Sequence, residues 1–265
     1  MTPAPALLPT SGRVRGVAYA VLGSGSPVTV FAHGLGGSLA ETRPLATRVP
    51  GTRVLLSFRG HGESDPLPGG WDYDVLADDL RAVADATGAE CAVGLSLGSG
   101  ALLRVLTDEP DRFRRLAFVM PAGIDATRAD GATLQLESLG DAIDAADADA
   151  VTEILMRDIP GPVRERRGIR TLVARRAAQL ATRPAPRPLH DDRPLRDRAP
   201  LQRIRVPVLV VGQEGDPLHR LDLAEELYRE LPDARLLALP EGGVFWTASR
   251  QVQDALAEHL GEDAQ

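Results

Sequence analysis

The stretch AECAVGLSLGSGALLRVL, residues 89–106, decides the fold of this chain. Its first half is a short, nearly continuous apolar run, which is typical of a parallel strand covered on both faces. Its second half has the apolar spacing of a helix that begins directly after the strand. The junction GLSLG (94–98) fits the pattern G-x-S-x-G, in which a tight turn makes a serine hydroxyl project above the sheet. We therefore predict a nucleophile at Ser96; the alternative is a serine that only caps the helix.

Apolar runs of similar length recur on both sides of this stretch, with helical patterns between most of them. Such an alternation predicts an α/β fold with a doubly wound, mostly parallel sheet. An alternating segment at 12–27 predicts an antiparallel hairpin at the sheet edge. The expected strands are 28–34, 52–60, 89–96, 114–123, 205–213 and 234–240, and the expected helices include 71–88, 219–232 and 249–260.

The pattern changes at 125–200, where no strand signal occurs. Residues 125–153 hold eight acidic side chains and one arginine, whereas residues 157–205 hold fourteen arginines and five acids. A cluster of prolines then returns the chain to the sheet. We predict a helical cap at 125–200, inserted into a single core that is formed by residues 1–124 and 201–265.

A second motif, HGLGG (33–37), directly follows an expected strand. If the chemistry is acyl transfer, the backbone N–H groups of Leu35 and Leu97 form an oxyanion hole, because two fixed donors favour a tetrahedral intermediate. We expect His33 to shape this loop through backbone hydrogen bonds. We also place His33 and Gly34 at the substrate pocket.

A third motif, RGHGES (59–64), follows the next expected strand. In this order and spacing the three motifs resemble the α/β-hydrolase fold superfamily, in particular its small bacterial esterases, lactonases and peroxidase-like members. The resemblance covers roughly residues 15–124 and 203–262 and implies a pocket between the sheet and the cap. One departure is Ser57, where such proteins commonly carry aspartate. We expect this change to affect the anchoring of the loop more than the chemistry.

The resemblance also implies an acidic residue after the strand at 205–213. The segment GQEGDPLH (212–219) supplies Asp216 at the matching position. Glu214 is a weaker candidate because it stands earlier in the turn. The alternative for Asp216 is a helix-start residue before Pro217 with no catalytic role.

The base is missing from the position that the resemblance implies. That position, after the last strand in LPEGGVFW (239–246), holds Val244, and we expect Val244, Phe245 and Trp246 to line the pocket. A valine cannot accept the serine proton. In a protease where it was measured, loss of the triad histidine cost about six orders of magnitude in turnover.

Four other histidines are candidate substitutes. His219 is the most plausible base, because it lies three residues after Asp216 at the same rim of the expected sheet. His61 stands in the RGHGES loop, and His190 stands in the cap, from which it could swing over the pocket. His259 is expected on a solvated face of the last helix.

The arginine-rich half of the cap has two interpretations. One is a solvated helix face that is balanced by the acidic half through ion pairs. The other is that Arg164, Arg166, Arg167 or Arg170 contacts an anionic substrate, such as a carboxylate, or an acyl carrier protein.

Composition excludes several classes of function. The chain has 265 residues, a net charge of −7 and one cysteine, Cys91, so neither nucleic-acid binding through phosphate neutralisation nor an internal disulfide is expected. All 30 basic residues are arginine and asparagine is also absent, which indicates a GC-rich bacterial genome, with actinobacteria as the expected source. Without lysine, Schiff-base chemistry and attachment of pyridoxal phosphate are impossible. We expect a cytoplasmic protein without metal or other cofactor and without membrane contact, since no signal peptide or membrane span is visible.

These observations favour an enzyme that keeps Ser96 and Asp216 but lacks the usual base. The preferred hypothesis is a non-hydrolytic step (cyclisation, isomerisation or lyase chemistry) on a small carbonyl-containing metabolite of bacterial secondary metabolism. One alternative is an esterase, thioesterase or lactonase with a displaced base such as His219. Another is a non-catalytic ligand-binding protein. A last one is that Val244 is an introduced change.

Overall fold

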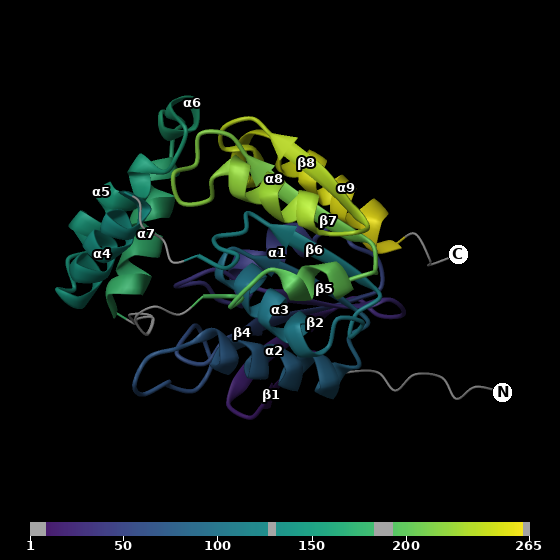
Figure 1. The fold of residues 1–265 in the computed structure, drawn as a ribbon. Helices are drawn as coiled ribbons and strands as arrows, with labels where there is room; N and C mark the ends of the chain where they lie inside the picture. The colour runs from purple at the N-terminus through teal and green to yellow at the C-terminus, as the bar shows by residue number, and fades with distance from the viewer. Residues whose placement is uncertain (1–8, 127–130, 183–192, 262–265) are drawn as a thin grey trace.

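An eight-stranded sheet forms the centre of the molecule (Figure 1). The computed structural model describes residues 9–126, 131–182 and 193–261. The strand order is β1-β2-β4-β3-β5-β6-β7-β8, and the strands from β3 to β8 run parallel, which confirms the predicted doubly wound, mostly parallel sheet. The strands are β1 (Ser11–Val14), β2 (Val17–Leu22), β3 (Val28–Ala32), β4 (Thr52–Ser57), β5 (Cys91–Leu95), β6 (Arg115–Val119), β7 (Val208–Gln213) and β8 (Ala234–Leu239).

The burial of each strand explains its sequence pattern. β5 and β6 are buried along their whole length, which agrees with their nearly continuous apolar sequences. β1 alternates exposed and half-buried residues and pairs antiparallel with β2, so that Val14 lies opposite Val17. The expected edge hairpin is therefore confirmed.

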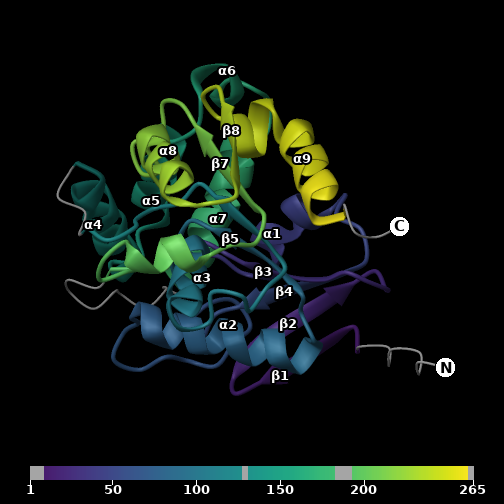
Figure 2. The same cartoon turned by 45° about the vertical axis from the view of Figure 1, so that its right-hand side comes forward.

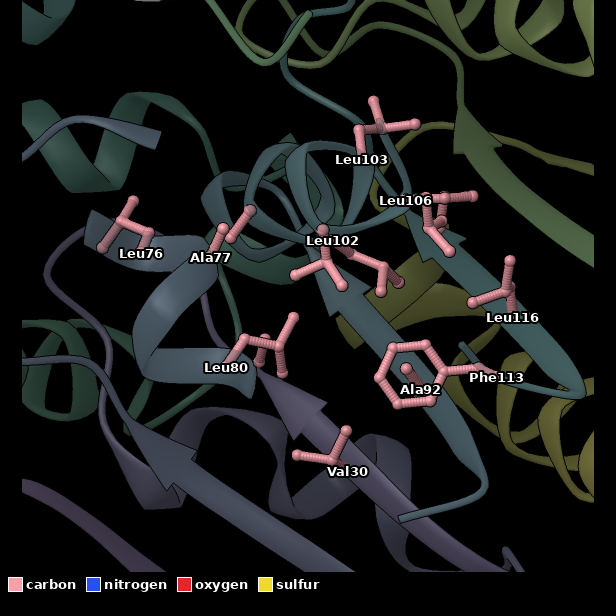
Figure 3. Close-up of a cluster of buried hydrophobic side chains, with 14 of the residues drawn as sticks. Val30, Leu76, Ala77, Leu80, Ala92, Leu102, Leu103, Leu106, Phe113 and Leu116 are labelled. Carbon is pink, nitrogen blue, oxygen red and sulfur yellow. The ribbon is translucent and has the colours of Figure 1, made fainter. Parts of the chain in front are cut away.

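One face of the sheet is covered by α2 (Tyr73–Thr87), α3 (Leu97–Asp108) and α8 (Leu221–Glu230). Figure 3 shows how the leucines of α2 and α3 meet side chains of the strands in one apolar cluster. α2 ends at Gly88, whose φ of +65° is the left-handed conformation that closes a helix. Members of this cluster include Val30, Leu76, Leu80, Ala92, Leu102, Leu106, Phe113 and Leu116.

The opposite face is covered by α1 (Leu39–Ala46) and α9 (Ser249–Gly261). Their apolar residues, such as Leu45 and Leu256, form a second cluster with the strands. We call it the α1–α9 cluster below. A short π-helical turn, η2 (Gly243–Thr247), connects β8 to α9.

Between β6 and β7 the described chain is helical, with α4 (Gly131–Asp144), α5 (Ala148–Arg157), α6 (Gly161–Arg164) and α7 (Ile169–Thr182). We call these the cap helices. They gather on one side of the core, away from the end of α9 (Figures 1 and 2). Two apolar clusters of their own hold them together. A 3-10 turn, η1 (Ala199–Arg203), then leads back to β7.

The parallel strands bring distant loops together. The loops after β3, β4, β5 and β7 all leave the same edge of the sheet, which is where open α/β sheets bind ligands. These loops carry the HGLGG, RGHGES, GLSLG and GQEGDPLH segments. Within the described ranges no helix is long and apolar enough to cross a membrane.

Candidate active site

Ser96 stands on a strained turn between β5 and α3. Its φ of 52° and ψ of −111° lie outside the regions that side-chain-bearing residues usually adopt. Backbone bonds fix the turn, because Ser96 N–H donates to Val119 O at 3.0 Å and Ser96 O accepts from Ser99 N–H at 2.9 Å. Such strain costs on the order of 1–3 kcal/mol and clusters at functional turns. The strand, turn and helix expected around Ser96 are all present.

Two glycines make this turn possible. A Cβ on Gly98 would lie 2.4 Å from the carbonyl oxygen of Ala32, and a Cβ on Gly94 would lie 2.6 Å from the carbonyl oxygen of Gly98. Both neighbours are backbone atoms, so neither can give way without moving a strand or a helix. α3 therefore approaches β3 and β5 so closely that only glycine fits at these positions.

His219 lies against Ser96. Its Nε2 is 2.8 Å from Ser96 Oγ, and its Nδ1 is 3.1 Å from Oδ2 of Asp216. The partners assign the ring: Nδ1–H donates to the carboxylate, and Nε2 accepts from the serine hydroxyl. The imidazole is 15% exposed and the carboxylate 14%. The structure thus brings Ser96, His219 and Asp216 into one hydrogen-bonded chain.

Asp216 is surrounded by hydrogen-bond donors. Its Oδ1 accepts from the backbone N–H groups of Leu218 and His219 at 2.9 and 3.0 Å, and its Oδ2 accepts from the side-chain amide of Gln213 at 3.0 Å. Burial alone raises the pKa of this carboxyl, but the hydrogen bonds from His219 and the backbone outweigh burial and leave the pKa below its ordinary value. Asp216 is therefore ionised beside the imidazole. Glu214, the weaker candidate, is exposed.

Val244 is a core residue. Its side chain is 1% exposed and belongs to the α1–α9 cluster. Its N–H donates to Gln213 Oε1 at 3.1 Å, so Gln213 links the turn after β8 to Asp216. The position after β8 thus holds a buried valine, and the turn after β7 brings His219, the most plausible substitute for the base, to Ser96.

The two aromatic residues after Val244 contact neighbouring apolar clusters. Phe245 packs against the α1–α9 cluster, and Trp246 packs against the cap cluster that contains Ile159 and Val163. A Cβ on Gly242, just before η2, would lie 2.1 Å from Cγ of Pro160 at the start of α6. η2 and the glycine before it therefore contact the cap helices and hold them against the core. The expected place of both aromatic residues in a pocket wall stays a prediction.

His33 fixes the HGLGG loop. Gly34 O accepts from His33 Nδ1 at 2.6 Å and from Gly37 N–H at 2.9 Å, while His33 Nε2 accepts from Phe58 N–H at 3.1 Å. In a trans peptide the C=O and N–H groups point in opposite directions, so the bonds to Gly34 O also orient the N–H of Leu35. These contacts agree with the loop-shaping role expected for His33.

The two expected oxyanion donors neighbour the nucleophile. Leu97 is the first residue of α3, where N–H groups have no partner within the helix and carry partial positive charge. A Cβ on Gly34 would lie 3.3 Å from Cβ of Ser96, so the HGLGG loop contacts the serine. Leu35 follows Gly34, and Leu97 follows Ser96. Both N–H groups therefore belong to residues that adjoin this contact.

We predict that acidification destabilises the protein through His33. Burial, followed by the nearby His61, lowers the pKa of His33 from 6.5 to about 3. The unfolded chain therefore binds this proton below pH 6.5, whereas the folded protein binds it only near pH 3, so stability falls with falling pH in that window. Between pH 7 and pH 5 His33 alone removes about 2 kcal/mol of the free energy of unfolding. Urea denaturation at the two pH values measures the change.

Ring ¹⁵N chemical shifts report on the same group directly. We expect His33 to keep its neutral form with a proton on Nδ1 at pH 5, because Nε2 must accept from Phe58 N–H. A ring titration with its midpoint near pH 6.5 in the folded protein would contradict this assignment.

Hydrogen bonds hold the RGHGES segment and the strand end before it in place. Ser57 Oγ accepts from Leu39 N–H at 3.1 Å and lies 3.3 Å from Oε2 of Glu63. Arg59 binds Asp79 twice, through its N–H at 2.9 Å and through Nε at 2.7 Å. The anchoring role expected for Ser57 agrees with these bonds.

The other candidate bases do not reach the serine in the described part of the chain. His61 is 2% exposed and its Nδ1 lies 3.2 Å from Arg59 O. His259 is 1% exposed and its Nε2 lies 2.9 Å from Leu116 O, so the expected solvated position is wrong: α9 turns this side chain toward the sheet. His190 lies outside the described residues.

The expected arginines have different environments. Arg164 donates to Ile159 O at 2.9 Å, and Arg170 forms an exposed ion pair with Glu153. Arg166 and Arg167 are exposed. Within the described residues no group of three or more His, Cys, Asp or Glu side chains is placed to hold a metal ion.

Three residues near the site escaped the sequence analysis. Gln213 ends β7, and the carboxyl end of a parallel strand is a position at which it could have been suspected. Glu41 and Arg176 carry no motif. Arg176 donates to Gly36 O, and Glu41 accepts from Gly34 N–H, although Arg176 is far away in sequence.

Comparison with known proteins identifies the family. The model of the alpha/beta hydrolase family matches residues 12–258. The chain is 25% identical over 262 residues to an AB hydrolase superfamily protein of Bacillus subtilis, which covers 89% of this chain and 92% of that protein. It is also 36% identical over 113 residues, 40% of this chain, to the dihydrolipoyllysine-residue acetyltransferase component of the acetoin cleaving system of Cupriavidus necator, and this match spans 30% of the relative's length. The enol-lactonase of Burkholderia xenovorans has a similar structure, with a TM-score of 0.74 at 18% identity over 93% of this chain and 98% of that one. This chain belongs to the alpha/beta hydrolase family.

Proposed function

We propose that this protein is a serine hydrolase that cleaves carboxylic esters, thioesters or lactones. Ser96 is the nucleophile, His219 the general base, and Asp216 the carboxylate that orients the base. The observation that carries the proposal is the 2.8 Å contact between His219 Nε2 and Ser96 Oγ, because a nucleophile and a base at this distance exchange a proton directly. The bond from His219 Nδ1 to Asp216 supports the same assignment.

Acylation follows from these contacts. His219 Nε2 takes the Ser96 proton while Oγ attacks the carbonyl carbon of the substrate. The imidazolium that forms is stabilised by the ionised Asp216. The N–H groups of Leu35 and Leu97 donate to the oxygen of the tetrahedral intermediate, and each such donor lowers the barrier by about 3–4 kcal/mol. His219 then returns the proton to the leaving oxygen or sulfur as its bond to carbon breaks.

Deacylation uses the same groups. His219 Nε2 takes a proton from a water molecule, whose oxygen attacks the acyl carbon on Ser96. The second tetrahedral intermediate collapses when His219 protonates Ser96 Oγ, and the carboxylic acid leaves. One base thus serves both halves of the reaction.

The non-hydrolytic hypothesis loses its main argument. It rests on the absence of a base at Val244, whereas His219 stands at Ser96. The likeness in fold to an enol-lactonase is in keeping with acyl cleavage as the chemistry. The anionic substrate and the acyl carrier protein, both expected from the arginine-rich half of the cap, stay predictions.

Labelling with a fluorophosphonate tests the proposal. Such a reagent phosphonylates a serine that a neighbouring base activates, so we expect intact-mass spectra to show one added phosphonyl group and peptide mapping to place it on Ser96. Ser96→Ala should stay unlabelled. Ser24→Ala, which removes an exposed hydroxyl before β3, is the matched control and should label like the parent protein.

The same preparation is assayed with short nitrophenyl esters and a thioester. A folded protein that neither reacts with the fluorophosphonate nor cleaves any of these substrates would contradict the proposed function. Labelling at a serine other than Ser96 would contradict the assignment of the nucleophile.

A further inference from the structure

Arg176 connects the cap to the HGLGG loop. It lies on α7, and its Nη2 donates a hydrogen bond to Gly36 O. Leu180, one helical turn later, lies so close that a Cβ on Gly36 would be 2.9 Å from its Cδ2. The cap helices therefore contact this loop through one charged and one apolar side chain, in addition to their contact with η2.

Glu41 holds the same loop from the core. It stands on α1, and its Oε2 accepts from Gly34 N–H at 2.8 Å. The loop wraps the carboxylate tightly, since a Cβ on Gly37 would lie 2.2 Å from Oε2. Its other oxygen, Oε1, is 3.8 Å from Nη2 of Arg176. Burial raises the pKa of Glu41, while Arg176 and the Gly34 N–H oppose the rise.

Together these two side chains bind the residues on either side of Leu35, whose N–H is an oxyanion donor in the proposed mechanism. Glu41 fixes the N–H of the residue before it, and Arg176 fixes the C=O of the residue after it. The bonds to Gly34 O lie within the loop, whereas these two come from α1 and α7. The orientation of the donor thus depends on a helix of the core and on a helix of the cap.

Arg176 also has an electrostatic effect, because it lies next to the carboxyl group of Glu41. A Cβ on Gly34 would lie 3.3 Å from Ser96 Cβ and 3.5 Å from Glu41 Oε2. The same point next to Gly34 is thus close to both the nucleophile and the carboxylate. When Glu41 is ionised, a form that Arg176 and the Gly34 N–H favour by lowering its pKa, a negative group so close repels the negative oxygen that develops in the tetrahedral intermediate. Arg176 stands beside Glu41 with the opposite charge and offsets that repulsion.

We propose that Arg176 is a positioning residue for the hydrolytic reaction, which fixes the HGLGG loop from the cap and offsets the charge of Glu41 beside the oxyanion. The inference rests on the proposed function for its catalytic part. Because the contacts involve the loop rather than the substrate, the loss of Arg176 acts on kcat and on the rigidity of the loop.

Arg176→Met tests the proposal, since it keeps the length and the apolar part of the side chain. We expect kcat for a nitrophenyl ester to fall by about 10- to 100-fold, less than for complete loss of an oxyanion donor, with KM within about threefold of the parent value. Arg176→Lys keeps the charge and should recover part of the loss. Arg175→Met removes an exposed arginine that neighbours Arg176 on the same helix, and it should leave kcat unchanged.

Glu41→Gln combined with Arg176→Met separates charge from geometry. A glutamine oxygen still accepts from Gly34 N–H, but the negative charge is gone. We therefore expect the double variant to regain about threefold or more of the kcat that Arg176→Met loses. A double variant that is slower than Arg176→Met would overturn the electrostatic part of the proposal.

Hydrogen exchange tests the loop independently of catalysis. In Arg176→Met the amides of Gly34 and Gly37, which are bonded in the parent protein, should exchange about tenfold faster or more, with little change in α2 or α3. Unchanged exchange together with an unchanged kcat overturns the proposal, and a loss confined to KM shows that Arg176 binds substrate instead. If Ser96 proves unreactive, faster exchange in Arg176→Met still shows that Arg176 fixes the HGLGG loop. Failure of the proposed function is therefore distinguishable from failure of this inference.

Discussion

We expect His219→Ala to lower kcat for a nitrophenyl ester by about 10⁴- to 10⁶-fold, because it removes the group that takes the proton of Ser96 in the proposed mechanism. His219 Nε2 lies 2.8 Å from Ser96 Oγ, and no second described histidine bonds to the serine. The residual rate reflects binding and the oxyanion donors alone, which supply about 10³–10⁴ over water in a serine protease. Steady-state kinetics at saturating substrate and the rate of fluorophosphonate labelling measure the loss.

Two further measurements sharpen this result. Added imidazole should recover part of the activity of His219→Ala, because the deletion leaves space beside Ser96. Val244→His in the same background should recover none, since the Val244 side chain lies in the α1–α9 cluster. A loss of less than about tenfold in His219→Ala, or full recovery by Val244→His, would show that the base has been assigned to the wrong residue.

We expect Asp216→Asn to lower kcat by about 10⁴-fold, the size of the effect that this exchange has in a serine protease. Every contact of the carboxylate in the described structure is a donor: the N–H groups of Leu218 and His219 on Oδ1, and Gln213 and the His219 ring on Oδ2. An asparagine accepts on one side only, so its NH₂ group must face donors on the other. The imidazole then loses its orientation, its Nδ1–H form and the charge that stabilises the imidazolium.

Glu214→Gln is the matched control for this exchange. It removes a neighbouring carboxylate of the same turn whose side chain is exposed, and we expect kcat to stay within about twofold of the parent value. Near-normal activity in Asp216→Asn, or a comparable loss in Glu214→Gln, would contradict the assignment of the acid. Thermal unfolding of both variants shows whether the turn itself remains intact.

The centre of the sheet was predictable because its strands are buried on both faces. Continuous apolar runs, such as those of β5 and β6, leave few alternatives, and glycine spacing around Ser96 marks the turn that follows. Helix α1 gave no comparable signal: it is short and contains Pro44. His259 was misplaced because its helix is polar on average, while the direction of one side chain depends on how α9 packs on β6.

The base could be suspected but not fixed from sequence. His219 and Asp216 are three residues apart, yet only the curvature of the turn after β7 decides whether the ring faces Ser96 or solvent. Glu41 and Arg176 could not be paired, because their contact depends on how the cap places α7 against the HGLGG loop. Such contacts follow from tertiary packing, for which a single sequence offers no periodic signal.

The contact between η2 and the cap helices has a consequence for related sequences. In the proposed mechanism acid and base share one turn, so only two segments of chain must stay in register for proton transfer, and the loop after β8 carries none of the three proposed catalytic groups. Trp246, packed among residues of the cap, shows what that loop does instead. We expect related sequences that carry histidine at the position of His219 to keep an apolar residue at the buried position of Val244 and at that of Trp246.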